Sequence, residues 1–276
     1  MNFINFLLQS SEKTQVIIFS IMLVAGWNIE NIAGLAMNYK KWNHALLNSK
    51  FILTGVLPQF FMSLLFVKTM QWTSLHHFGI LYHLPYMDMD HPLVLFLASF
   101  ILLDFGEYVY HVIMHKVKRL WMFHAVHHSD NVVDVSTTLR EHPVENIIRN
   151  SFTILWIFFS GALFWTVFVR QLIQMVSNLL AHMNYRLPKK LDAVIGMVFI
   201  TPNLHHVHHH YQKPYTDHNY GDVLSIWDRM FGTFCNLPEQ EIVFGVDFYM
   251  DKKLNSSYLS LLKMPFGKYK KVDEKK

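Results

Sequence analysis

The sequence has little cysteine and little charge, and it lacks several short motifs of common enzyme classes. Its single cysteine, Cys235, excludes an internal disulfide and any Cys-x-x-Cys metal or redox site. No Gly-x-Gly pair occurs, so the dinucleotide-binding fingerprint is missing. Neither His-Glu-x-x-His nor Glu-x-x-His is present. Their absence argues against a zinc hydrolase of the first type and against a carboxylate-bridged bundle of the second.

Apolar residues make up 52% of the 276 residues and charged residues only 16%. The apolar residues gather in runs at 14–37, 51–70, 92–113 and 147–181. Each run is close to or above the ~20 residues that a helix needs to cross a membrane. The first fourteen residues lack the pattern of a removable signal peptide, so we expect the first helix to stay as an anchor. The sequence predicts an all-α integral membrane protein.

The placement of charge predicts the topology. Basic residues follow the first and third apolar runs and recur in the C-terminal segment: Lys40, Lys41, Lys50, Lys116, Lys118, Arg119 and the tail from Lys263 to Lys276. The loop before the third run carries Asp88 and Asp90 and no Lys or Arg. The positive-inside rule then places residues 114 onward in the cytoplasm. A bacterial inner membrane is the expected host, and the basic tail is interpreted as a solvated end rather than a nucleic-acid site.

The fourth apolar run must return to the side from which it enters, because polar, histidine-rich segments lie on both sides of it. Its 35 residues reach about 52 Å as a helix, enough for two limbs of roughly 26 Å. Ser160 and Gly161 lie near its middle, where a helix breaks most easily. We expect a re-entrant helical hairpin, which makes about four transmembrane segments. One long crossing is the alternative, and it would separate the two histidine-rich segments.

The chain contains no internal repeat and no linker to a second soluble domain. We divide it into N-terminal transmembrane helices and loops (1–91), a histidine-rich catalytic domain (92–236) and a basic C-terminal tail (237–276).

Histidine occurs 18 times, and 13 of these residues lie between His111 and His218. Most follow helical spacings of three or four residues, which place side chains on one face. The boxes comprise His111 and His115; His124, His127 and His128; and His205, His208 and His209, with His182 just after the hairpin. Neutral imidazole is a common ligand of transition metals. The spacing therefore predicts a shared metal site.

Nine histidines are too many for one ion and suit two, since a closed zinc site takes four ligands and usually includes cysteine. Nearby acids are candidate partners for the imidazole N–H groups. These acids are Asp104, Glu107, Asp130, Asp134 and Asp222.

The motifs resemble those of the fatty acid hydroxylase and sterol desaturase superfamily over roughly residues 95–236. They are DFGEYVYHVIMH, HAVHH, EHPVE, AHMNYRLP, TPNLHHVHHH and the closing run NYGDVLSIWDRMFGTF, which is also similar to that of alkylglycerol monooxygenases. The resemblance implies a helical membrane stem, a cytoplasmic helical cap, and a di-iron site where the two meet. It assigns the nine box histidines as ligands.

The resemblance leaves a tenth ligand open. Many members carry a histidine where this sequence has Asn178, so Asn178, His142 or water are the candidates. The additional histidines His206, His210 and His218 fall outside the pattern, and we interpret them as structural or supporting residues.

The implied activity is oxidation of a lipid by dioxygen at two ferrous ions, giving hydroxylation or desaturation. Sterol, fatty acyl and ether lipids all remain open as substrates. Electrons must come from a separate partner, either a ferredoxin or cytochrome with its reductase, or a reduced pterin. A metal transporter would carry ligands near the membrane midplane, and a zinc-dependent hydrolase would need a general base beside its water. Both readings remain as alternatives.

Overall fold

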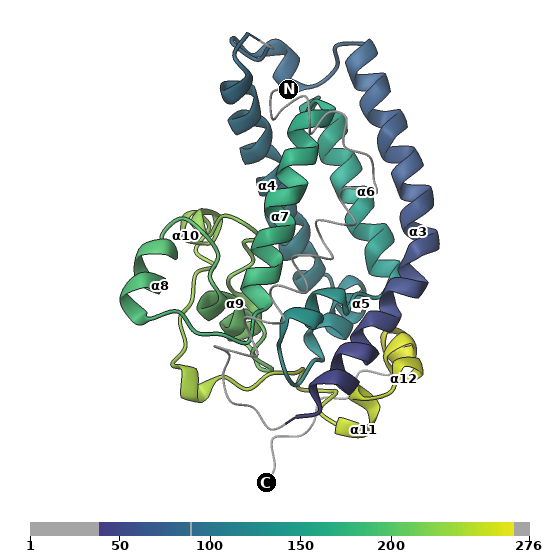
Figure 1. Ribbon diagram of the computed structural model, residues 1–276, viewed down its shortest axis with the longest axis vertical. Coiled ribbons are helices and arrows are strands. Elements are labelled where there is room, and N and C mark those ends of the chain that lie inside the picture. Colours follow the sequence, from purple (N-terminus) through teal and green to yellow (C-terminus); the bar gives the residue numbers. More distant parts are fainter. Residues whose placement is uncertain (1–38, 89, 268–276) are drawn as a thin grey trace.

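A computed structural model of the protein describes residues 39–88 and 90–267, and the predicted first span at 14–37 lies outside these residues. Four long helices form the stem: α3 (Lys41–Leu75), α4 (Pro92–Lys116), α6 (Pro143–Ser160) and α7 (Phe164–His182). They run along the long axis of the molecule, and shorter helices gather at their lower end and along one side (Figure 1). No strand forms in the part of the chain that the structure describes, so the all-helical prediction is confirmed there.

The shorter helices are η1 (Ile80–His83), α5 (Lys118–His128), η2 (Val135–Leu139), α8 (Lys189–Ile195), α9 (Pro202–His208), η3 (Tyr215–Asp217), α10 (Ile226–Met230), η4 (Glu239–Glu241), α11 (Lys252–Asn255), α12 (Tyr258–Lys263) and η5 (Met264–Phe266). The shorter helices other than η1 lie at the histidine-bearing end or beside it, whereas η1 lies at the opposite end, next to the hairpin tip.

Among the described residues, α3 and α4 are the helices long and apolar enough to cross a membrane by the test of length and composition. They contain the predicted spans 51–70 and 92–113. The outer face of α3 exposes large apolar side chains such as Leu53, Leu57 and Phe61. A face of this kind needs an apolar environment.

The hairpin predicted at 147–181 is present as α6 and α7. Gly161 ends α6 in the left-handed conformation with a φ of 69°, and α7 begins at Phe164. A Cβ atom on Gly161 would lie 2.5 Å from the carbonyl oxygen of Phe78. Gly79 has a φ of 122°, and its own Cβ would lie 2.3 Å from the backbone nitrogen of Gly161. Two glycines therefore allow the hairpin tip to pack against the chain that precedes η1.

The core of the stem joins all four long helices. Buried side chains from α3, η1, α4, α6 and α7 pack together: Met70, Leu81, Leu95, Leu103, Ile157, Trp165 and Val167. This core holds the hairpin-tip end of the stem together, and the box histidines lie at the other ends of α4 and α7.

The C-terminal segment differs from the predicted solvated tail. Val246, Leu261 and Met264 are buried against Phe51 of α3 and Val126 of α5. The physical reason is the apolar content of 246–266, which gains by leaving water. This part of the segment expected as a tail therefore packs against the helix that carries the second histidine box.

Candidate metal centre

Four helices bring the nine box histidines to one end of the stem. The last turns of α4 carry His111 and His115, and α5 carries His124, His127 and His128. His182 ends α7, and α9 with the residue after it provides His205, His208 and His209. The Thr201 hydroxyl accepts a hydrogen bond from the Leu204 backbone N–H, and Pro202 occupies the first turn. This cap starts α9 where His205 and His208 share one face.

The nine side chains separate into two adjacent groups. The first contains His111, His115, His124, His128 and His208, and the second contains His127, His182, His205 and His209. Within each group, one ring nitrogen from every residue lies within 4.8 Å of the others. The rings of His128 and His209, one from each group, stack with centroids 4.5 Å apart.

Four of these rings are oriented by oxygen atoms at Nδ1. His111, His182 and His208 each place Nδ1 2.8 Å from a backbone carbonyl, those of Tyr220, Asn178 and His218 respectively. His124 places Nδ1 against the carboxylate of Glu145. An oxygen of this kind accepts only, so Nδ1 must carry the proton. Nε2 then carries a lone pair that points toward the centre of its group.

In the first group, Nε2 of His111 lies 3.1 Å from Nε2 of His124, and two lone pairs that face each other at this distance need a cation between them. In the second group, His182 Nε2 lies 3.0 Å from the Nε2 atoms of His127 and His205 and 3.2 Å from that of His209. In the first group, Nε2 of His208 has no hydrogen-bond partner. Neutral imidazoles with outward N–H groups held by carbonyls or a carboxylate are the form that binds transition metals. The residues present therefore fit a histidine-held ion in each group.

Burial keeps the rings neutral. It lowers the pKa of His208 to about 3, and it lowers the pKa values of His127, His128 and His209 well below the usual value. Nearby histidines lower them further, because a second positive charge would repel the first. Neutral imidazole is the form that donates a lone pair to a metal.

The structure places different acids beside the histidines from those expected. Asp104 accepts hydrogen bonds from Trp227 and Leu224, and Asp222 lies 3.9 Å from Arg170. Glu145 contacts His124 instead, and Asp217 lies 3.5 Å from His115. Glu145 stands just before an apolar run, where a carboxylate needs a partner, and this position is the signal from which its role could have been predicted.

The two candidates for a tenth ligand lie in different surroundings. His142 caps α6, accepting a hydrogen bond from the Val144 N–H at Nδ1, while its Nε2 faces the Leu262 carbonyl. Asn178 orients His182 through its backbone oxygen and lines a cavity beside the second group. Of the additional histidines, His218 contributes the carbonyl that holds His208, and His210 accepts a hydrogen bond from the Val243 N–H.

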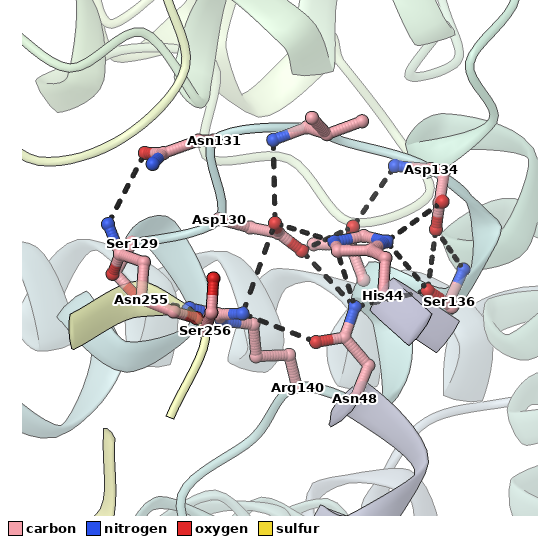
Figure 2. A network of polar contacts seen from close by, with 12 residues as sticks. His44, Asn48, Ser129, Asp130, Asn131, Asp134, Ser136, Arg140, Asn255 and Ser256 are labelled. Carbon is pink, nitrogen blue, oxygen red and sulfur yellow. Dashed lines mark hydrogen bonds and ion pairs between the residues drawn. The ribbon is translucent and has the colours of Figure 1, made fainter. Parts of the chain in front are cut away.

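A buried polar network supports the box on α5, and the sequence reasoning missed most of it (Figure 2). Arg140 donates to the Val126 carbonyl near the end of α5 and to the Asn48 side chain of α3. Asp130, two residues after the box, contacts His44 at 2.8 Å and accepts a hydrogen bond from Asn48. The network ties the lower end of α3 to the end of α5.

The charges in this network are balanced. His44 directs Nε2 at Asp130 and Nδ1 at Asp134, an arrangement that a doubly protonated ring satisfies. Burial opposes ionisation of Asp130, but the charges of His44 and Arg140 outweigh it and hold the pKa of this carboxyl well below its usual range. From the sequence, Asp130 and Asp134 were candidate partners of the box histidines. In the structure they contact α3 and η2 instead.

Comparisons with known proteins agree with this geometry. The model of the fatty acid hydroxylase family matches residues 96–233, a range that contains all nine box histidines. Human alkylglycerol monooxygenase is 30% identical over 200 residues, covering 71% of this chain and 42% of that protein. The ornithine lipid hydroxylase of Rhizobium tropici is 30% identical over 172 residues, covering 61% of this chain and 49% of that protein.

The alkylglycerol monooxygenase of Xenopus tropicalis is 34% identical over 173 residues, covering 60% of this chain and 35% of that protein. In each of these three comparisons the match spans less than half of the relative's length. No solved structure matches the chain.

Proposed function

The chain belongs to the fatty acid hydroxylase family, and from this premise we propose that it is a membrane-bound di-iron oxidoreductase that oxidises a lipid with dioxygen. The observation that carries the proposal is the convergence of one ring nitrogen from each of the nine histidines in two adjacent groups, with Nδ1 of four rings held by an oxygen atom. Histidines of the first group would hold one iron and those of the second group the other. Bound ferrous ions supply the chemistry that reduces dioxygen and removes hydrogen from an unactivated C–H bond.

The reaction needs two electrons that this chain does not store. Hydroxylation consumes one C–H bond, dioxygen, two electrons and two protons, and it yields an alcohol and water. Desaturation consumes two adjacent C–H bonds with the same inputs and yields a double bond and two waters. A ferredoxin or cytochrome with its reductase, or a reduced pterin, would supply the electrons.

The chain's own residues hold the site in shape. Glu145 and the carbonyls of Tyr220, Asn178 and His218 fix four rings. Tyr110 donates a hydrogen bond to Glu145 at 3.4 Å and packs from α4. Seven of the nine box histidines are buried and the other two, His111 and His127, are partly buried, which keeps bulk water away from the ligand nitrogens.

We place the protein in a membrane as a multi-pass protein, with residues after α4 on the cytoplasmic side of a bacterial inner membrane. The apolar outer faces of α3 and α4 and the basic residues that follow α4 support this topology. The bilayer, the lipid and a redox protein are the proposed partners, and nucleic acid is not among them.

Oxygen-18 labelling tests the activity. Iron-loaded protein in nanodiscs is supplied with a chemical reductant, a lipid extract and labelled dioxygen. We expect a lipid that gains one labelled oxygen or loses two hydrogens, and we expect no product from His208→Ala. His91→Ala changes an exposed histidine outside both groups and serves as the control. An iron-loaded protein that consumes dioxygen without altering any lipid would contradict the proposal.

A further inference from the structure

The two limbs of the hairpin, α6 and α7, enclose a polar space. α6 packs closely on α3 and α4, and α7 packs on α4, α9 and η2, but close backbone approaches between α6 and α7 are few. A cavity of about 240 Å³ lies between them. It shares Glu107, Arg149 and Asn178 with a smaller cavity of about 50 Å³ that touches His111, His124, His127, His182 and His205. The space therefore leads to the histidine groups.

The lining of the larger cavity is polar although the hairpin is apolar elsewhere. α7 contributes Gln171, Gln174 and Asn178 at helical spacing, and α6 contributes Arg149, Asn150 and Thr153. Leu155 and Phe159 of α6 and Leu180 of α7 are exposed on other faces. Polar side chains turned inward from a membrane-embedded hairpin are costly unless they serve binding or transport.

Charged groups of both signs line this space: Glu107 and Arg149 line both cavities and Asp222 lines the smaller one, with Arg170 behind them. Arg170 is buried on α7, and its guanidinium donates to Gln174 and lies 3.8 Å from Glu107 and 3.9 Å from Asp222. Nε and Nη2 of Arg170 and Oδ2 of Asp222 have no hydrogen-bond partner. Burial and the neighbouring Glu107 raise the pKa of Asp222 to about 7, although Arg170 opposes the shift. The site therefore offers donors and acceptors together.

The size of the cavity limits what enters it. Its volume lies below the ~300–1,000 Å³ of pockets that enclose drug-sized ligands. A sterol or a complete acyl chain does not fit a polar cavity of this size, whereas a compact polar group does. The scarcity of close contacts between α6 and α7 leaves a lateral route by which an attached chain reaches the bilayer.

We propose that the cavity between α6 and α7 binds the polar headgroup of the substrate lipid, a compact group with hydrogen-bond donors and acceptors such as a polyol or a zwitterionic amino acid. The C–H bond that is oxidised then lies in the headgroup or in the carbons next to it, not in the middle of an acyl chain. This inference rests on the proposed lipid oxidation at the same site.

Anaerobic binding tests the inference without turnover. Three probes share a hexadecyl chain: hexadecylglycerol, O-hexadecylserine, whose ammonium and carboxylate are both free, and hexadecane without a headgroup. Partition of each labelled probe into nanodiscs with the iron-loaded protein gives its affinity. We expect both headgroup probes to bind more tightly than hexadecane. Equal affinity for hexadecane would overturn the inference.

Variants of the cavity wall sharpen the test. Gln171→Leu replaces a cavity-lining amide with an apolar group, and we expect about tenfold weaker binding of the headgroup probes. Ser151→Leu is the matched control, because Ser151 is exposed on α6 beside Asn150. Iron content reports whether each variant folds. Unchanged headgroup binding in an iron-loaded Gln171→Leu variant would contradict the inference.

Two further results separate this inference from the proposed function. Displacement of hexadecylglycerol by a soluble reduced pterin would assign the cavity to a reductant and overturn the inference. Headgroup binding that is intact and sensitive to Gln171→Leu, without any oxidised lipid after reductant and dioxygen are added, would support the inference while the proposed oxidation fails.

Discussion

The orientation of a histidine ring depends on the atom that accepts its outward N–H. Three of the four such acceptors found for the box histidines are backbone carbonyls, which a substitution does not remove. Glu145 is the side-chain acceptor of the set, and its contact with His124 is buried. It therefore offers the most direct test of ring positioning at the scale of a single residue.

Glu145→Ala leaves His124 without its acceptor, so the ring can turn and its Nε2 loses basicity. We expect iron affinity to fall about 10–100-fold, as for other second-layer partners of metal ligands. Glu145→Gln keeps an acceptor without the charge, so its iron affinity is expected to lie between those of the unsubstituted protein and Glu145→Ala. Competition with a chelator measures the affinity. Glu241→Ala, an exposed glutamate, is the control, and an unchanged affinity in Glu145→Ala would refute the role.

The Asp130 carboxylate is surrounded by cations and donors in the network below the site. Asp130→Ala leaves His44 and the buried Arg140 without this partner. Breaking a buried charge pair by removing one side costs ~3–5 kcal/mol, and we expect a loss of that order in the free energy of unfolding. Tryptophan fluorescence during denaturant unfolding in detergent measures it. Asp90→Ala changes an exposed aspartate and serves as the control. An equally small change in the free energy of unfolding in both variants would disprove the stabilising role of Asp130.

At the scale of the helix, the hairpin tip depends on the left-handed turn at Gly161. A side chain there costs about 1–2 kcal/mol in backbone conformation and also meets the Phe78 carbonyl. We expect Gly161→Ala to lower the free energy of unfolding by at least that amount. Gly55→Ala should have the opposite sign, about 0.5–1 kcal/mol of stabilisation, because Gly55 lies inside α3 with open space around its Cα.

The same denaturant measurement on both glycine variants decides the point. Equal changes of the same sign in the free energy of unfolding of Gly161→Ala and Gly55→Ala would contradict the role of the left-handed turn at the hairpin tip.

Local patterns were sufficient to predict the long helices and the break at Gly161, because apolar runs and a mid-run glycine are properties of neighbouring residues. The start of α3 was not predictable in this way. The sequence places a span at 51–70, whereas the helix begins at Lys41. Its first turns are polar, and His44 and Asn48 gain their partners from Asp130 and Arg140, more than 80 residues later.

The candidate site was likewise predictable only where it depends on neighbouring residues. Helical spacing brought the histidines of each box onto one face, and their gathering into one centre rested on the predicted hairpin. Most of the atoms that orient the histidine rings could not be predicted from the sequence, since the carbonyls of Tyr220 and His218 belong to loops whose path depends on the whole fold. Asp217 meets His115 only because η3 folds back toward the end of α4.

At the scale of the whole molecule, the proposed topology requires both ends of the histidine-rich region to face one side of the membrane. Arg119→Cys and Lys190→Cys introduce exposed cysteines after α4 and after α7. In a Cys235→Ser background we expect a membrane-impermeant reagent to label both from the cytoplasmic side. Labelling of the two positions from opposite sides would rule out a hairpin that returns to its starting side.

The account rests most heavily on two metal ions held by the two groups of histidines. The most direct test is metal analysis with Mössbauer spectroscopy on protein purified from cells grown with iron-57. We predict two coupled irons per chain, which His127→Ala in the second group and His208→Ala in the first both disrupt, while His91→Ala retains them. A fully iron-loaded protein that holds a single ion, or one that retains only zinc, would contradict the central claim.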